Sequence, residues 1–403
     1  MPKIVNSQEN FLGIYTFSYN SFKAHVTIDT IHNRHWDKTI NFNIEANIEC
    51  PIKYGYKPGK GLVKFNQYNG AIEDSNVLGE LLNTNNNDPK KLAKFLMTYG
   101  SLFSNEHYSF TKYDFTSLSL VVNRLRWSVE LLSQICESKN RNYKKLFKLI
   151  LLLFFEKDIE IRNHNKALIY QRKHELKQEL FTHISSGSAY QYLAFYNEQK
   201  DDEITEESST RTFDFEDSIL GKQKILFSEY EKMMDHDPHI PETLNALAFL
   251  HFENRNDNHI ILWDLLYHFF KDYPELVISI NNLDFEKYDS HNIKINDVYK
   301  DAIVRVAKGM LATEINAHIK NVRPYFKFDV LEPSWKINDL ITAFYLSLFY
   351  MKPNIELVRK CQNPNCNNYF VVSTSSTRTK YCCISCGNAV SQARYRANHK
   401  YGK

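Results

Sequence analysis

The chain has 403 residues, of which 43% are hydrophobic and 24% charged, and this balance excludes an intrinsically disordered chain. Its 50 basic and 47 acidic residues nearly cancel, which excludes a chain that is polycationic over its whole length. Aromatic residues are abundant at 14%, whereas glycine (12) and proline (11) are few, so we expect long helices rather than a turn-rich sandwich.

Length and cysteine usage set the expected organisation and compartment. A chain of 403 residues predicts about two or three packed units rather than one core. The first residues lack an apolar signal core, and the longest apolar runs, 149–155 and 340–351, fall short of the roughly 18 residues that span a bilayer. No cysteine pattern indicates a disulfide framework, so we expect a soluble cytoplasmic protein without a membrane partner.

Residues 1–72 are predicted to form a β-rich N-terminal region. Aromatic or β-branched residues alternate with polar ones at 14–17, 24–28 and 40–44, which is typical of antiparallel strands. The segment 57–61, Lys-Pro-Gly-Lys-Gly, lacks the Gly-Lys-Ser/Thr ending of a phosphate loop and is predicted to be a plain turn.

Residues 73–197 are predicted to form a helical domain. Asp88 before Pro89 is an N-cap signal that opens a helix from residue 90 to 103. The ranges 118–136 and 143–181 have amphipathic helical spacing, the second with a break near Asn163.

The next segment, 198–217, is predicted to be a linker because it has nine acidic residues against two basic ones. A sharper alternative is an acidic segment that competes with nucleic acid for a basic surface. A second helical block is predicted over 218–358. Its expected helices are 218–234, 241–253, 260–272, 296–320 and 338–351.

The last stretch, 359–403, has a charge that differs from that of the rest of the chain. Glu356 is the last acidic residue, and eight lysines and arginines follow it, which leaves 42 basic against 47 acidic residues before the tail. A mildly acidic body with a basic end is typical of a protein that presents one small module to a polyanion.

The same stretch has two cysteine pairs with the spacing of a zinc site. Cys361 and Cys366 form the first pair, and Cys382 and Cys386 form the second, about fifteen residues further on. Four thiolates leave no open coordination position, so we expect one structural Zn²⁺ rather than a catalytic ion. Cys383 is adjacent to Cys382 and is the alternative ligand. If Cys382 is the ligand, Cys383 is a free thiol beside the metal that could be redox-sensitive.

The tail resembles the CGNR-type zinc finger that ends a family of bacterial proteins interpreted as transcription regulators. The resemblance rests on the two cysteine pairs and on Phe370, Ser373, Arg378, Lys380, Tyr381 and the run Cys386-Gly387-Asn388. It implies DNA binding by the finger and a preceding helical domain of the ABATE type. Two departures stand out, Ala389 where the motif has arginine, and three residues between Cys382 and Cys386 where four are commoner.

A basic helix is predicted after Cys386. Its side chains suit phosphate contacts and, for arginine and glutamine, base-edge contacts in a major groove. The predicted nucleic-acid-binding residues are Arg378, Lys380, Gln392, Arg394, Arg396 and Lys400. The alternative is a solvated basic end with no partner. Arg394 and His399 also have a spacing found in helical RNA-cutting toxins, but they lie on a finger rather than between two long helices.

Together these patterns predict a mainly α fold with a small N-terminal antiparallel β region and a C-terminal four-cysteine zinc ribbon or treble-clef-like finger, 359–403. The favoured function is a DNA-binding transcription regulator whose helical region senses a signal or forms a homodimer. Two alternatives stay open. One is a phage-defence or toxin-type effector whose ribbon recruits nucleic acid or a protein, and the other is a purely structural ribbon. The pair His236 and His239 is interpreted as a surface loop, and no catalytic motif indicates an enzyme.

Overall fold

The computed structural model describes residues 15–400 apart from 19–20, 33–37, 67–69, 75, 85–87, 105–109, 138–140, 163–167, 187–211, 215–223, 227–242, 245, 248–249, 251–256, 280–281, 296, 329–330, 352–355, 367 and 374–378. The chain divides into two compact units, each built from segments that are distant in sequence. Unit 1 comprises Met1–Glu137, Ile159–Gln171 and Leu311–Lys403, and unit 2 comprises Ser138–Asp158 and Arg172–Met310.

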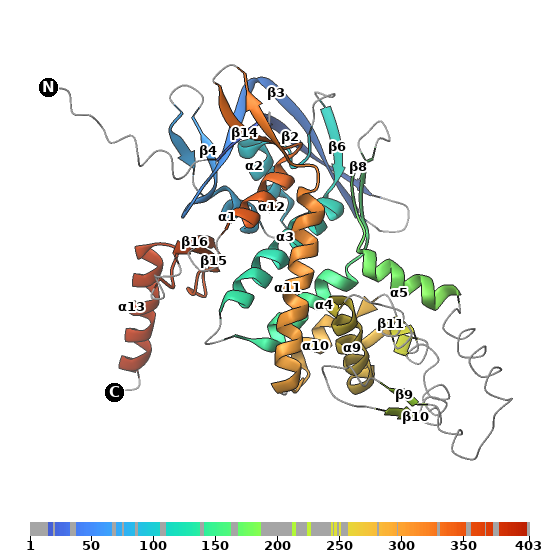
Figure 1. Ribbon diagram of the computed structural model, residues 1–403. Helices are drawn as coiled ribbons and strands as arrows, with labels where there is room; N and C mark the ends of the chain where they lie inside the picture. Colours follow the sequence, from blue (N-terminus) through green and yellow to red (C-terminus); the bar gives the residue numbers. More distant parts are fainter. Residues whose placement is uncertain are drawn as a thin grey trace, which may run out of the picture. The chain divides into compact units, whose positions relative to one another are not determined.

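Unit 1 is built on an eight-stranded sheet (Figure 1). The long strand β3 is at its centre, because it pairs antiparallel with β1, β2, β4 and β6 along different parts of its length. Strand β14 extends the sheet beyond β1 and is itself paired with β13. The strands are β1 Tyr15–Ser18, β2 Ser21–His32, β3 Lys38–Lys57, β4 Gly61–Phe65, β5 Ile72–Asp74, β6 Phe110–Asp114, β13 Arg323–Lys327 and β14 Glu332–Lys336.

The predicted N-terminal strands are confirmed. The alternation of apolar and polar side chains explains why these segments form strands with one buried face. Phe42 and Ile44 of β3 are fully buried, whereas the intervening Asn43 hydrogen-bonds Asp29 on the exposed side. The predicted turn at residues 57–61 is also confirmed, since it joins β3 to β4 with Gly59 at a φ of 77°.

The prediction of a mainly α fold with a small N-terminal β region is confirmed in part, because the N-terminal strands are present but the sheet also takes strands from later in the chain. Strand β6 and the hairpin β13–β14 reach the sheet from residues 110–114 and 323–336, both within segments predicted as helical blocks. The fold therefore combines many helices with a substantial sheet, in which β1 and β14 pair in parallel and the other described pairs are antiparallel. Strands β13 and β14 contain proline and charged residues, as in Arg-Pro-Tyr-Phe-Lys. These residue types are uncommon in strands, so the sequence pattern does not predict a strand here.

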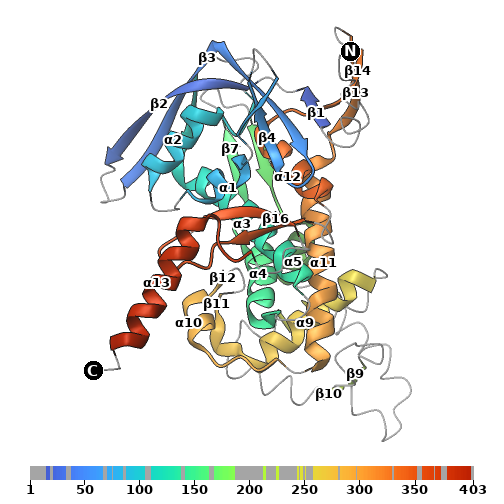
Figure 2. The same ribbon diagram turned by 90° about the vertical axis from the view of Figure 1, so that its left-hand side faces the viewer.

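Helices of unit 1 lie against one side of the sheet (Figures 1 and 2). Helix α12 is hydrophobic all round and is buried from Leu340 to Leu348, as a central core helix must be. A side-chain cap starts α2 as predicted, since Asp88 accepts from Lys90 N, and Asp339 caps α12 in the same way by accepting from Thr342 N. The helices are α1 Val77–Leu82, α2 Pro89–Tyr99, α3 Phe115–Cys136, α12 Leu340–Tyr350 and the C-terminal part of α11 Asp297–Ile319.

Unit 2 is mainly helical, with an aromatic core. Phe147 packs edge-on against Phe269 with ring centroids 5.0 Å apart, and Phe154 does the same with Trp263 at 6.0 Å. Its elements are α4 Tyr143–Phe155, α5 Glu175–Ser186, β9 Thr212–Asp214, β10 Lys224–Leu226, α9 Asp257–Asp272, the 3₁₀ turn Pro274–Leu276, β11 Val277–Ser279, β12 Asn282–Leu283, α10 Phe285–Ser290 and the N-terminal part of α11.

The range 143–181, predicted as helical with a break near Asn163, is interrupted between its two ends, but by a hairpin rather than by a simple break. Helices α4 and α5 form its two ends, but Ile159–Arg162 and Leu168–Arg172 pair as the hairpin β7–β8. Residues of β7 alternate between buried and exposed, which is a strand period rather than a helical one.

Several other expectations fall on residues that the structure does not describe. The predicted acidic linker 198–217 lies outside them except for β9, and the histidine pair at 236 and 239 lies outside them entirely. The predicted domain boundaries stay a prediction, because compact units describe packing rather than independent folding. Within the described part of the chain, no helix combines the length and apolar character needed to cross a bilayer.

A buried ion pair joins two helices inside unit 1. Arg124 of α3 binds both carboxylate oxygens of Glu314 on α11, at 2.8 and 3.0 Å. Tyr345 of α12 donates to the same carboxylate at 3.1 Å, and burial followed by the Glu314 charge raises the pKa of this tyrosine well above its usual value.

The network continues from Glu314 through His318. His318 Nδ1 donates to the Glu314 carbonyl oxygen at 2.8 Å, so in the neutral ring Nε2 accepts from Tyr170 OH at 2.9 Å. The His318 ring stacks on Tyr345 with centroids 3.7 Å apart. These contacts fix the packing of α3, α11 and α12, and α3 in turn packs against strand β15, Glu356–Lys360.

The ion pair gives a stability prediction. Arg124→Met leaves the Glu314 carboxylate buried without its guanidinium and should lower the free energy of unfolding by about 3–5 kcal/mol. The double variant R124M/E314L removes both charges and should be less destabilised than R124M alone. Chemical denaturation of the three proteins provides the test. A double variant no more stable than the single one would show that the charge pair is not the source of the loss.

Candidate metal centre

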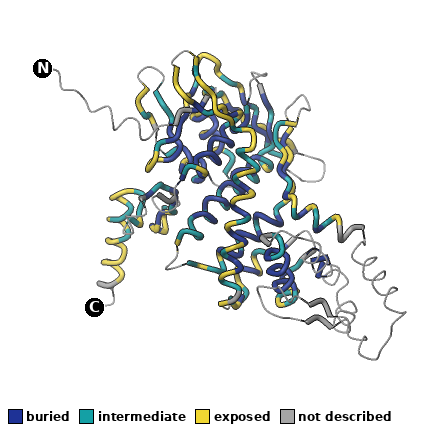
Figure 3. The backbone as a smooth tube through the Cα atoms, in the orientation of Figure 1, coloured by how far each residue is buried: buried dark blue, intermediate teal, exposed yellow. Residues whose placement is uncertain are grey.

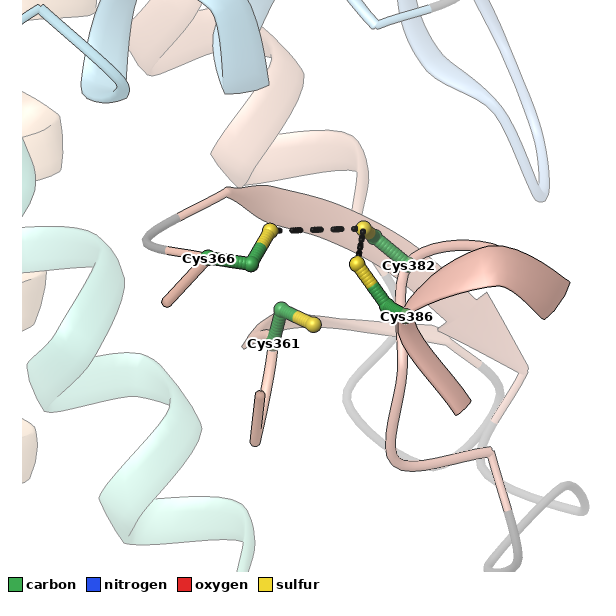
Figure 4. Close-up of side chains that lie close together, drawn as sticks. All are labelled: Cys361, Cys366, Cys382 and Cys386. Carbon is green, nitrogen blue, oxygen red and sulfur yellow. Dashed lines mark hydrogen bonds between the residues drawn. The ribbon is translucent and has the colours of Figure 1, made fainter. Parts of the chain in front are cut away.

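The C-terminal module consists of a hairpin followed by a helix. Strand β15, Glu356–Lys360, pairs antiparallel with β16, Tyr369–Ser373, and helix α13 runs from Ile384 to Lys400. One cysteine-containing turn joins the two strands, and a second leads into α13. The first turn contributes the thiols of Cys361 and Cys366. The second turn and the start of α13 contribute those of Cys382 and Cys386, and the four lie close together (Figure 4).

Local hydrogen bonds form the first turn. Cys366 N donates to the Asn363 carbonyl at 2.9 Å, and the Asn363 side chain accepts from Asn365 N at 3.1 Å, which is an Asx-type turn. Cys361 N donates to the Asn368 carbonyl at 2.8 Å, so the strand pairing continues up to the first thiol. The sequence Asn-Pro-Asn between the cysteines suits this geometry.

The second turn is attached to the first. Gln362 N donates to the Lys380 carbonyl at 2.9 Å, which brings the segment before Cys382 beside the first turn. Gly387 N donates to the Cys383 carbonyl at 3.3 Å as α13 begins. A Cβ on Gly387 would lie 3.3 Å from the Tyr381 ring, so this glycine allows the ring to pack on the first helical turn.

The four predicted cysteines lie together. Sγ of Cys382 is 3.7 Å from Sγ of Cys366 and 3.7 Å from Sγ of Cys386. All four sulfurs, including that of buried Cys361, lie within 4.8 Å of one another. A tetrahedral zinc with Zn–S bonds of about 2.3 Å separates its sulfurs by about 3.8 Å. The donor set and its spacing therefore fit a structural Zn²⁺.

The electrostatics of the cluster favour a bound cation. Burial raises the pKa of the Cys382 thiol far above its usual range, and hydrogen bonds with neighbouring thiols, Cys366 first, raise it further. Burial acts in the same direction on Cys361, but hydrogen bonds with the backbone N–H groups of Asn363 and Cys382 and with the Cys382 and Cys366 thiols together leave the pKa of Cys361 lowered. Four thiolates in this volume repel one another, and a metal cation removes that penalty.

Cys383 lies outside this group. Its thiol is exposed, and its Sγ is 3.8 Å from Sγ of Cys382 and 2.9 Å from Oγ of Ser385. The structure thus brings Cys382 rather than Cys383 together with the other three thiols.

Three side chains of unit 1, at the two ends of α1 and on α3, hold the hairpin by hydrogen bonds to the single residue Tyr369. Tyr369 N donates to the Asn83 side chain at 2.9 Å, and the Tyr369 carbonyl accepts from the Asn76 side chain at 3.2 Å. The Tyr369 hydroxyl donates to Glu130 of α3. Burial, together with that carboxylate, raises the pKa of Tyr369, so its hydroxyl stays a donor at neutral pH.

Close packing adds to these hydrogen bonds. Tyr369 and Val358 on one face of the hairpin and Val372 on the other are each about 95% buried, which removes their apolar surface from solvent. Gly79 of α1 packs against the hairpin backbone. A Cβ atom added at this position would lie only 2.5 Å from the Tyr369 carbonyl oxygen. The residues Asn76, Gly79, Asn83 and Glu130 form what we call the finger dock. Sequence reasoning missed all four, because nothing in their local pattern points to residue 369.

Helix α13 is largely exposed, since its residues from Ser391 to Ala397 are all exposed and Cys386, Gly387 and Val390 in its first half are half-buried (Figure 3). Gln392, Arg394 and Arg396 are exposed on this helix, and Lys380 is exposed just before the second turn. Lys400 lies in the last turn of α13, but its side chain is not among those that the structure describes. Arg378 lies outside the described residues. The structure therefore places three predicted nucleic-acid-binding residues on one exposed helix.

Residues 358–399 match the model of the CGNR zinc finger family. Comparison with curated proteins and with solved structures gives no match for the chain. The family match and the four clustered thiols confirm the predicted resemblance and the zinc cofactor. The ABATE-type body and the bacterial origin stay predictions, because the match covers the finger alone.

The finger dock gives a second prediction. Alanine normally stabilises a helix relative to glycine by up to about 1 kcal/mol. Gly79→Ala should do the opposite here, because its Cβ collides with a backbone oxygen, with a loss of about 1–3 kcal/mol. Hydrogen exchange should accelerate in β15 and β16. Glu80→Ala, at the next and exposed position, is the control. Unchanged exchange in G79A would mean that the hairpin is not held there.

Proposed function

We propose that this protein binds DNA through the exposed helix of its zinc finger and acts as a transcription regulator in the cytoplasm. The observation that carries the proposal is the surface of α13. It presents Gln392, Arg394 and Arg396 to solvent on a segment that lacks any acidic side chain. Such a helix suits the phosphate backbone and the major groove of a duplex.

The zinc ligands in this proposal are Cys361, Cys366, Cys382 and Cys386. A four-thiolate ion has no open coordination position, so its role is to fix the start of α13 against the hairpin in a treble-clef-like arrangement. Binding energy of the metal becomes folding energy of the finger, since a hairpin and one helix alone bury little surface.

The proposed contacts divide into two kinds. Lys380 and Lys400 are suited to phosphates, which position the helix without reading sequence. Gln392, Arg394 and Arg396 have the side chains that can read base edges. Arg378 is assigned to phosphate contact on its charge alone. Ala389, at the place where the family motif has arginine, removes one cation from this surface.

The body has a matching role in this proposal. The finger dock holds the hairpin by the backbone of Tyr369, so a change in α1 or α3 is transmitted to the base of the DNA-binding helix. A signal bound by the helical body, or dimerisation through it, could then alter how α13 is presented.

Zinc content tests the ligand assignment. Purified protein should contain one zinc per chain by mass spectrometry under native conditions. Cys361→Ser and Cys382→Ser should each lose it, because three thiolates and an alcohol bind zinc far more weakly. Cys383→Ser should keep it. Zinc retained in C382S and lost in C383S would reverse the assignment.

Salt-dependent binding tests the DNA contacts. Fluorescence anisotropy with a duplex should give an affinity that falls steeply as the salt concentration rises, because binding releases counterions. The variant R394A/R396A should bind more weakly, by about 1–3 kcal/mol for each arginine that reads a base edge. Lys91→Ala/Lys94→Ala removes the same charge from exposed positions on α2 and is the matched control.

Two results would contradict the proposal. One is the absence of any salt-dependent binding at low ionic strength, with the zinc-loaded protein confirmed as folded. The other is an equal loss of affinity in the α2 control, which would show that binding follows total charge rather than the helix α13.

A further inference from the structure

Cys383 and Cys386 are separated by two residues at the start of α13. The segment reads Cys383-Ile384-Ser385-Cys386, and the helix begins at Ile384. Residues three apart in a first helical turn lie on the same side of the helix, and the bond from Gly387 N to the Cys383 carbonyl closes this turn. One thiol of the pair is exposed, and the other belongs to the four-sulfur cluster.

We propose that Cys383 is an oxidation site that forms a disulfide with Cys386 and thereby removes a zinc ligand. The inference rests on the proposed ligand set. Oxidants of the hydroperoxide class reach Cys383 first, because among the five tail cysteines it alone is exposed in the structure.

Cys386 is a better partner for Cys383 than Cys382 is, although the Cys382 sulfur lies only 3.8 Å away. A disulfide between adjacent residues closes a small ring that includes the peptide bond, and the planar trans peptide resists this closure. The Cys-x-x-Cys spacing has no such obstacle and is a known redox spacing at helix starts. Ser385 Oγ, 2.9 Å from the Cys383 sulfur, is placed to hydrogen-bond the reacting sulfur.

The chemistry balances with one equivalent of hydrogen peroxide. The Cys383 sulfur attacks one peroxide oxygen, the O–O bond breaks, and a sulfenic acid and water result. The Cys386 thiolate then attacks the sulfenic sulfur, the S–S bond forms, and hydroxide leaves and takes up a proton from solvent as water. One thiol and one thiolate are oxidised to a disulfide, and one peroxide is reduced to two waters.

The disulfide has a direct consequence for the metal. Cys386 changes from a thiolate to a disulfide sulfur, which is a poor ligand, so three thiolates remain on the ion. The zinc holds the start of α13 against the hairpin, and its loss frees the proposed DNA-binding helix. A thiol reductant with added zinc reverses both steps.

The test compares zinc-loaded wild-type protein with Cys383→Ser and with Cys136→Ser, a matched variant at a lone cysteine on α3. Hydrogen peroxide is added, a chromogenic chelator follows zinc release, and mass spectrometry of digests maps disulfides. Release from C383S should be slower on the order of tenfold, because the exposed thiol that starts the reaction is gone. C136S should match the wild type, in which the linked peptides should contain Cys383 and Cys386.

Equal release rates in wild type and zinc-loaded C383S would overturn the inference and leave the ligand assignment intact. So would a wild-type disulfide map confined to Cys361, Cys366 and Cys382. A C383S protein that never binds zinc would overturn both, since Cys383 would then be a ligand. Failure of DNA binding in the salt experiment leaves this inference standing, because zinc release is measured without nucleic acid.

Discussion

Four thiolates can share one small volume only around a cation, and the C-terminal module depends on this constraint. The sulfurs of Cys366, Cys382 and Cys386 lie at the edge lengths of a zinc tetrahedron, and buried Cys361 completes it. The ion ties two turns that are otherwise joined mainly by backbone hydrogen bonds. It therefore determines where α13 starts, and through this the direction in which the basic side chains of that helix project.

The metal and the finger dock both constrain the end of the hairpin at which the turn lies. Zinc fixes the turn between β15 and β16, while Asn76 and Asn83 hold the backbone of Tyr369, three residues after Cys366. Only Cys386, in the first turn of α13, takes part in the metal site, and the helix is left exposed from Ser391 to Ala397. The burial pattern divides the finger accordingly. Its hairpin belongs to the core of unit 1, and its helix is available to a partner. A finger tethered only by a flexible chain would not transmit a change in the body to its helix.

Local signals were sufficient for the metal centre, and long-range contacts were not predictable. Cysteine spacing, the N-caps Asp88 and Asp339, and the turn at Gly59 each depend on a few adjacent residues, and the structure has each of these features. The strands β13 and β14 were missed because their prolines and charges oppose strand propensity, and only pairing with β1 makes them strands. The bond from Tyr369 to Asn83 joins residues 286 positions apart, and a single sequence carries no signal for such a pair.

The position of Cys383 separates two roles that one residue type could fill. A thiol beside a zinc site can be a fifth, competing ligand or a reactive group, and exposure decides between them. A competing ligand must reach the space among the other sulfurs, whereas Cys383 is turned toward solvent and Ser385. The spacing of Cys383 to Cys386 allows the proposed disulfide between them. That disulfide would take Cys386 away from the ion, and a site of four thiolates has no further protein ligand to replace it. A structural zinc ion takes no part in catalysis, but it stays bound only while its thiolates stay reduced. In the proposed reaction, the exposed thiol beside the site is where oxidation would begin.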